Sequence, residues 1–199
     1  RVLLDMLGMP EVRDGPFQLQ ASLKPKDGNF SVSAIGKLGE FDLSIEGTSR
    51  DPLALDGIDA ELSVDGPSLA EAGAMFDVQG LAAVPYSIKS HVRRNGMLFQ
   101  IVSGSALVSD NQLHLSGQLP KFPDTDDWQF YLDGKNLNLA LLAPTLGVKG
   151  IPDTRYTLNG QLMSSREGTE LLNVNLIGEK SRLKIDGTLG EAPSYHGSR

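Results

Sequence analysis

Apolar and polar residues alternate along many short stretches of this chain. In a typical stretch, Leu113 and Leu115 flank His114. Successive side chains of a β-strand point to opposite faces of a sheet, so strict alternation predicts strands with one apolar and one solvated face, as antiparallel sheets allow. The pattern occurs at residues 17–23, 41–45, 58–64, 86–92, 113–115, 128–132, 156–158 and 183–185. The sequence therefore predicts an all-β protein built from antiparallel strands.

Asp-Gly and Asn-Gly pairs stand between or at the ends of these stretches. Both residues of such a pair tolerate positive φ, which the tight turns of β-hairpins require. Asp-Gly occurs six times and Asn-Gly twice, with the first residues at Asp14, Asp27, Asp56, Asp65, Asn95, Asp133, Asn159 and Asp186. Each pair is a predicted hairpin turn.

The same short motifs return at a period of about 70 residues. The sequence Leu-x-Ile/Leu-x-Gly ends at Gly47, Gly117 and Gly187, which are 70 residues apart. A second landmark, an aromatic residue followed two positions later by an aliphatic one, begins at Phe17, Tyr86 and Tyr156. Two landmarks with one period predict tandem repeats.

Each repeat also opens with a short helical pattern. Leu69, Ala72, Gly73 and Phe76 have the spacing i, i+3, i+4, i+7; Leu137, Ala140, Leu141 and Pro144 repeat it, and Leu3, Met6 and Leu7 match its first three positions. One unit is therefore a short helix and about four strands, over residues 1–66, 67–134 and 135–190, with a disordered tail at 191–199. If the units pair edge to edge, the strands around Gln20 and Lys184 lie near the two ends of the array.

Composition narrows the possible partners. The net charge of −7 disfavours nucleic acid, because phosphates would repel the chain. The chain has no cysteine, which excludes a disulfide framework, thiol catalysis and Cys-ligated metal. The sequence shows no signal peptide and no stretch of 18 apolar residues long enough to cross a membrane.

Reactive residues do not gather into a recognisable catalytic or metal-binding motif. His91 and His114 fall on the polar phase of their strands, and we expect solvated side chains at both. The acidic run at 124–127 lacks the Gly and the distal Glu of an EF-hand loop, so it predicts a polar turn. Arg93 and Arg94 beside Asn95-Gly96 predict a charged hairpin end, with a contact to a lipid headgroup as the less favoured alternative. We expect no catalytic residue, no metal, no cofactor and no enzymatic activity.

The apolar faces of the strands remain as the candidate functional surface. They have two possible arrangements, which periodicity does not separate: a closed β-sandwich core, or an open apolar groove formed by stacked repeats. The candidate lipid-facing residues are Leu19, Leu43, Ile45, Leu62, Ile88, Leu113, Leu115, Phe130, Leu132, Leu158, Leu183 and Ile185.

The segment 132–160 resembles the AsmA family of Gram-negative envelope proteins. A strand ends in a polar residue and Gly134, a Leu-rich short helix follows, and then Gly150-Ile-Pro152 leads into a second strand that ends at Gly160. The segment 62–86 repeats this progression, and the resemblance extends over 58–190 and more weakly over 1–57. In the first unit Gly8 and Pro10 follow the helix unusually closely. The matching residues are structural and not reactive.

The resemblance implies a fold and a function. AsmA-like proteins are held in the inner membrane by an N-terminal helix and extend through the periplasm as repeated sheets that curl into an apolar groove for phospholipid. It therefore implies a periplasmic segment, with an anchor outside this chain, that binds or conducts phospholipid or fatty-acyl chains toward the outer membrane. Expected partners are lipid, other repeats of the parent chain and envelope proteins. The alternative is a structural or adaptor β-repeat segment that supports outer-membrane assembly without carrying lipid.

Overall fold

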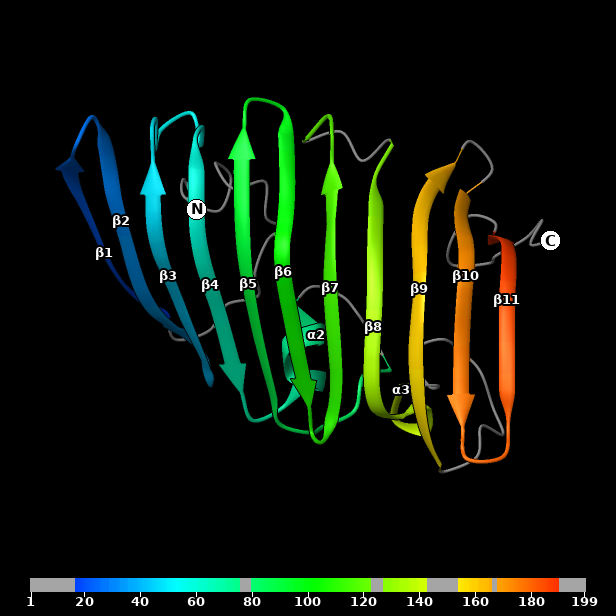
Figure 1. The fold of residues 1–199 in the computed structure, drawn as a ribbon. Helices are drawn as coiled ribbons and strands as arrows, with labels where there is room; N and C mark the ends of the chain where they lie inside the picture. Colours follow the sequence, from blue (N-terminus) through cyan, green and yellow to red (C-terminus); the bar gives the residue numbers. More distant parts are fainter. Residues whose placement is uncertain (1–16, 76–79, 123–126, 143–153, 166–167, 190–199) are drawn as a thin grey trace.

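The strands form one antiparallel sheet in which neighbours in the chain are neighbours in space (Figure 1). The computed structural model describes residues 17–75, 80–122, 127–142, 154–165 and 168–189. In chain order the strands are β1 (Phe17–Lys26), β2 (Asn29–Leu38), β3 (Phe41–Ser49), β4 (Ile58–Gly66), β5 (Tyr86–Asn95), β6 (Leu98–Val108), β7 (Asn111–Leu119), β8 (Gln129–Asn138), β9 (Arg155–Ser165), β10 (Gly168–Gly178) and β11 (Arg182–Leu189). The prediction of an all-β, antiparallel fold is confirmed.

The sheet is open and uncurled, with β1 and β11 as its two edge strands. Gln20 lies in β1 and Lys184 in β11, so the predicted placement of these two segments at the ends is confirmed. The curled sheet that we expected is not present. Alternation determines which face is apolar, whereas curvature depends on bulges and on what covers a face, and alternation does not encode either.

Two of the predicted hairpin turns form as expected. Asp27 and Gly28 join β1 to β2 with φ angles of 48° and 78°, and two positive φ angles are typical of a type I′ turn. Gly96, with φ of 60°, lies in the turn between β5 and β6.

Three other pairs lie inside strands, where turns were predicted. Asp133-Gly134, Asn159-Gly160 and Asp186-Gly187 belong to β8, β9 and β11. A Cβ atom on Gly134 would lie 2.6 Å from a methyl carbon of Leu137, and one on Gly160 would lie 2.7 Å from a methyl carbon of Val174. These two glycines therefore make room for a neighbouring side chain within the sheet. Asp65-Gly66 ends β4, Asp56-Gly57 belongs to the β3–β4 loop, and Asp14-Gly15 lies outside the described residues.

Two short helices follow β4 and β8 at the same end of the sheet (Figure 1). Helix α2 (Leu69–Met75) begins after Ser68, whose Oγ accepts a hydrogen bond from the Glu71 amide at 3.3 Å. Helix α3 (Leu139–Leu142) follows Asn138, whose Oδ1 accepts a bond from the Ala140 amide at 3.0 Å. The helix predicted from Leu69 is confirmed. Of the helix predicted over 137–144, only Leu139–Leu142 is helical in the described residues, and Leu137 belongs to β8. The helix predicted at 3–7 lies outside the described residues. Neither α2 nor α3 is long and apolar enough to cross a membrane.

Bulges interrupt the pairing in the central and C-terminal strands. The register shifts where β5 meets β6, where β6 meets β7, where β8 meets β9, and where β10 meets both of its neighbours. Asn136 and Asn173 have positive φ angles of 55° and 49° at two of these shifts, and Asn tolerates this conformation better than most residues. Beyond each bulge, the residues that point to a given face of the sheet are shifted by one position along the sequence.

Four large buried side chains lie near the end of the sheet where the helices are. Phe41, Tyr86, Leu137 and Tyr156 are between 2% and 9% exposed. The Phe41 and Tyr86 rings stand 6.2 Å apart on either side of Gly66, whose missing side chain leaves room for both. This cluster is a small core. Elsewhere on the sheet the buried apolar side chains are smaller, at Ala34, Ala60, Val92 and Val174.

Candidate functional site

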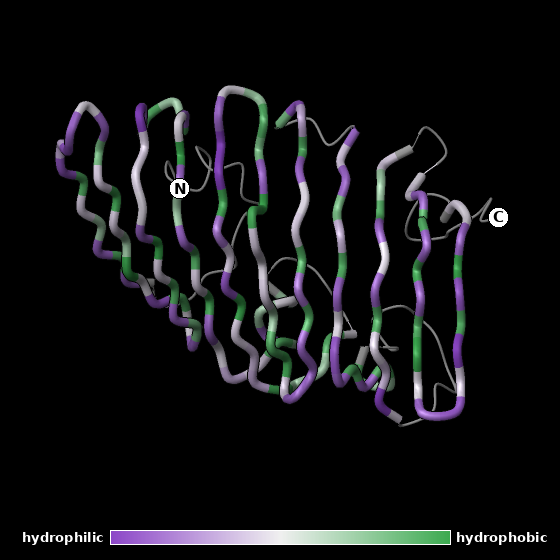
Figure 2. Tube along the Cα trace, in the orientation of Figure 1, coloured by the Kyte–Doolittle hydropathy of each residue, from purple (hydrophilic) through white to green (hydrophobic). Residues whose placement is uncertain are grey.

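The register of the sheet places apolar residues from every strand on a single face. Residues that pair directly across a ladder point to the same face. One row of paired positions runs through Leu19, Gly36, Leu43, Val64, Ile88, Ala106, Leu113, Gly134, Leu158, Leu176 and Leu183. We call the face that carries this row the apolar face. The tube in Figure 2 shows the underlying alternation of hydrophobic and hydrophilic residues along each strand.

Two further rows on the apolar face follow the first, both on its side toward the loop between β3 and β4. The second runs through Ala21, Ala34, Ile45, Leu62, Ser90, Gly104, Leu115, Leu132 and Gly160, beyond which Val174 pairs with Ile185. The third runs through Leu23, Val32, Gly47, Ala60, Val92, Ile101, Gly117, Phe130, Leu162, Leu171 and Gly187. All twelve candidate residues from the sequence therefore lie on one face. Their contact with lipid remains a prediction.

These side chains are only partly covered. None of the twelve candidates is buried: Ile88, Leu183 and Ile185 are 39%, 51% and 37% exposed, and the other nine are half-buried. In a closed sandwich the second sheet would cover them. The described residues contain a single sheet. Within that part of the chain, the arrangement is an open apolar surface and not a filled sandwich core.

Glycines shape this surface as much as the large residues do. A Cβ atom on Gly117 would lie 2.2 Å from the Gln129 carbonyl oxygen and 2.4 Å from the Phe130 ring. Gly47 stands in the same relation to β4, since a Cβ atom there would lie 2.3 Å from the Asp59 carbonyl oxygen. At these two positions the neighbouring strand approaches too closely for any side chain.

The opposite face is polar and carries a histidine between two carboxylates. The Nε2 atom of His91 lies 2.5 Å from an oxygen of Asp59, and its Nδ1 atom lies 3.6 Å from an oxygen of Glu61. The hydrogen bond from His91 comes first and that from Arg93 second in lowering the pKa of Asp59. The side chain of His91 is 21% exposed, so the expectation of a freely solvated His91 is wrong. His114 is exposed, as expected. Alternation predicted the face of His91 but not its cross-strand partners.

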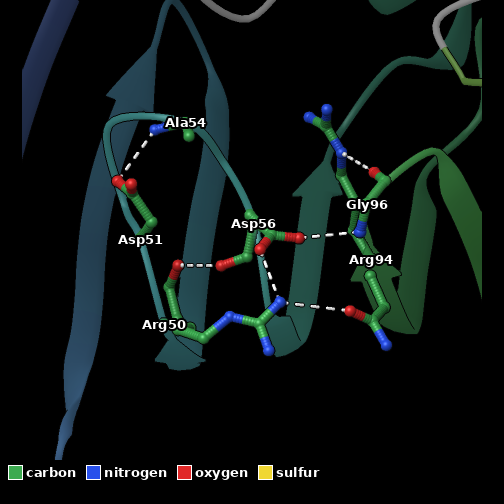
Figure 3. Close-up of polar contacts among 8 residues, drawn as sticks. Arg50, Asp51, Ala54, Asp56, Arg94 and Gly96 are labelled. Carbon is green, nitrogen blue, oxygen red and sulfur yellow. Dashed lines mark hydrogen bonds and ion pairs between the residues drawn. The ribbon is translucent and has the colours of Figure 1, made fainter.

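A cluster of polar contacts fixes the loop between β3 and β4 against the β5–β6 turn (Figure 3). Arg50 donates to Asp56 at 2.5 Å, and the Gly96 amide donates to the other Asp56 oxygen at 2.7 Å. These two contacts lower the pKa of Asp56 from 3.8 to about 2, with the bond from Arg50 as the largest cause. The cluster stabilises the loop end of the sheet and offers no open site.

The described residues show no group of three or more His, Asp or Glu side chains placed to hold a metal ion. Of the acidic run at 124–127, only Asp127 is described, and it pairs with Lys121 at 2.5 Å. The apolar face is therefore the principal candidate site. Comparison with protein-family models, with curated proteins and with solved structures finds no match to this chain.

Proposed function

We propose that the apolar face binds the acyl chains of phospholipids. The observation that carries the proposal is that apolar side chains from all eleven strands share one face and stay partly exposed to water. An acyl chain gains about 0.8 kcal/mol for each methylene that leaves water, so an uncovered apolar surface of this kind favours it. Binding of this type needs shape and apolar area, and it needs no catalytic residue.

The dimensions of the sheet suit an extended apolar ligand. Neighbouring strands lie about 4.8 Å apart, so the ten intervals between β1 and β11 give the face a length of roughly 48 Å across the strands. A repeat of four strands contributes roughly 19 Å of that length. Several chains can therefore lie side by side on one molecule, or one chain can pass from one unit to the next.

The wider context belongs to the same proposal. Gly47, Gly117 and Gly187 lie in β3, β7 and β11, four strands apart, which supports reading the sheet as repeats of four strands. In this proposal the chain is a periplasmic segment of an AsmA-like protein whose anchor in the inner membrane lies outside the chain. The repeats form a continuous apolar groove along which phospholipid passes toward the outer membrane. The resemblance at 132–160 and 62–86 supports this context.

Extraction of the purified protein with organic solvent, followed by mass spectrometry, tests the proposal. We expect phospholipid in amounts comparable to the protein, and binding of a fluorescent fatty acid to protein from which lipid has been removed. A clean extract together with no probe binding would contradict lipid binding. It would favour the alternative of a structural or adaptor segment.

A further inference from the structure

One charged residue lies on the apolar face. Arg94 pairs with Ile58 on β4 and with Phe99 on β6, and both partners belong to that face. Along the described strands, every other position of the apolar face holds an apolar residue, Gly, Ser, Thr or Asn. A cation among apolar side chains carries a cost in desolvation free energy unless a polar or anionic partner offsets it.

The guanidinium of Arg94 is held in place by neutral groups. Its Nε atom donates to the Gly96 carbonyl oxygen at 3.1 Å, as Figure 3 shows. Its central carbon stands 5.1 Å from the centre of the Phe122 ring, and Phe122 stacks on Phe99 at 5.3 Å. The two rings and the guanidinium form a stack at the loop end of the apolar face. An aromatic platform orients the charge without neutralising it.

Two nearby arginines differ from Arg94 in having carboxylate partners. Arg50 pairs with Asp56 at 2.5 Å, and Arg93 pairs with Asp59 at 2.9 Å. Within the part of the chain that the structure describes, no carboxylate lies within ion-pair distance of Arg94. Arg94 therefore presents an oriented positive charge beside apolar side chains.

We propose that Arg94 binds the phosphate of a phospholipid whose acyl chains lie on the apolar face below it. This inference rests on the proposed function and names the part of the ligand that the apolar residues do not recognise. A guanidinium matches two phosphate oxygens at once, and aromatic rings favour the boundary between acyl chains and headgroups. Phe99 and Phe122 occupy that boundary here.

The distance along the strand fits this orientation. From Arg94 to Tyr86 the strand β5 rises by eight residues, or roughly 27 Å at about 3.4 Å per residue. The acyl chains of one leaflet fill about half of a 30 Å bilayer core, or roughly 15 Å. Chains that start at Arg94 and follow the strands therefore end before the buried cluster around Tyr86. Ile88, Ser90 and Val92 lie along that path.

The test compares Arg94→Gln with Arg93→Gln, its neighbour on the polar face. The probes are a short-chain phosphatidylglycerol and the diacylglycerol with the same chains, which lacks the phosphate. Trp128 is the single tryptophan of the chain, and the centre of its ring lies 5.4 Å from that of Phe130. Its fluorescence therefore reports binding at this end of the apolar face. We expect Arg94→Gln to weaken phosphatidylglycerol binding about tenfold to a hundredfold, since it removes charge-assisted hydrogen bonds. Diacylglycerol binding should not change, and Arg93→Gln should leave both affinities as in the wild type.

Each other outcome points to a different failure. Equal phosphatidylglycerol affinity in the wild type and Arg94→Gln would overturn the phosphate site and leave the apolar site standing. No binding of either probe to the wild type would overturn the proposed function and the phosphate site with it. Full competition by inorganic phosphate at equal concentration would overturn the assignment to a lipid. Circular dichroism of Arg94→Gln confirms the fold, and Arg94→Lys should recover part of the affinity if charge is the cause.

Discussion

Leu115 and His114 are neighbours in β7 that point to opposite faces of the sheet. Leu115 pairs with Gly104 and Leu132 on the apolar face, whereas His114 pairs with Ser105 and Asp133 on the polar face. A charge placed at Leu115 therefore stands on the proposed lipid surface, and the same charge at His114 stands in water. The pair isolates the effect of one face.

Leu115→Glu should lose lipid while the protein stays folded. The half-buried leucine gives up part of its apolar burial, which lowers the free energy of unfolding by about 1 kcal/mol. A charge against an acyl chain should reduce lipid affinity roughly tenfold or more. Fatty-acid binding and urea unfolding measure the two effects. His114→Glu should leave lipid binding unchanged and should lower the free energy of unfolding by less than about 1 kcal/mol, because the glutamate would face Asp133. Complete unfolding of Leu115→Glu would instead indicate a closed core.

Asp56 should make stability depend on pH in the acid range. Its pKa is about 2 in the folded protein against an ordinary value of 3.8, because Arg50 and the Gly96 amide bond its charged form. A lowered folded pKa means that the contribution is fully present above about pH 4 and is lost as pH falls through about 2. The melting temperature should therefore fall less between pH 6 and pH 2 in Asp56→Asn than in the wild type.

The partner variant Arg50→Gln provides the control. It removes the largest cause of the lowered pKa of Asp56, so it should also reduce the change of the melting temperature with pH, although Asp56 itself remains. If the melting temperature of both variants changes with pH as in the wild type, other carboxylates cause the acid sensitivity and the role given to Asp56 is wrong.

At the scale of single elements, alternation predicts strands well where the period is uninterrupted. The eight stretches chosen from the sequence fall in β1, β3, β4, β5, β7, β8, β9 and β11. Strand β2 was not singled out because Ala34 and Gly36 weaken its apolar phase and Ile35 lies on the polar face. In β6 and β10, bulges move the apolar phase by one residue, so neither strand alternates strictly over its whole length.

The candidate site was predictable to the same extent as the strands. Side-chain direction follows from period 2, which is why the twelve apolar residues share a face. The special position of Arg94 was not predictable, because it depends on which residues pair across β4, β5 and β6. The sequence favoured a charged hairpin end for Arg93 and Arg94 together, with a lipid-headgroup contact as a minor alternative, and it did not separate the two residues; in the structure, they lie on opposite faces.

Glycine inside a strand should be essential where the neighbouring backbone is close. Gly117→Ala forces a Cβ atom to within 2.2 Å of the Gln129 carbonyl oxygen, and β7 and β8 must separate locally. We expect a loss of about 1–3 kcal/mol in the free energy of unfolding, measured by urea denaturation. Gly104→Ala is the matched control on β6, since its Cβ atom would lie 3.2 Å from the nearest atom, the Leu115 carbonyl oxygen. It should cost less than about 1 kcal/mol. Equal losses of stability in the two variants would mean that the close approach of β8 is not the reason why position 117 requires glycine.

At the scale of the whole molecule, the sheet has two long edges. The described residues of β1 from Gln20 onward are all exposed, as are those of β11 from Arg182 to Asp186. Neither strand pairs with a second neighbour in the described part of the chain. Unpaired backbone N–H and C=O groups along an exposed strand tend to find another chain.

The protein should therefore associate through its edges at high concentration. Light scattering across a concentration series should show a rising molecular mass, and amide exchange in β1 or β11 should slow over the same range. Amides in β6 should keep their protection throughout, because that strand is paired on both sides. A longer version of the chain with further repeats should associate less. Monomers at millimolar concentration would mean that the edges are already covered.

The parity of the strand number determines which symmetry such an assembly would have. Eleven strands, each antiparallel to the next, make β1 and β11 run in the same direction. A molecule that is only translated along the sheet would meet its neighbour through a parallel pair of strands. A half-turn about an axis perpendicular to the sheet instead brings β1 against β1 as an antiparallel pair, and it leaves both apolar faces on the same side. A two-fold axis is therefore the operation that would extend one apolar surface over two molecules while keeping the pairing of the sheet itself.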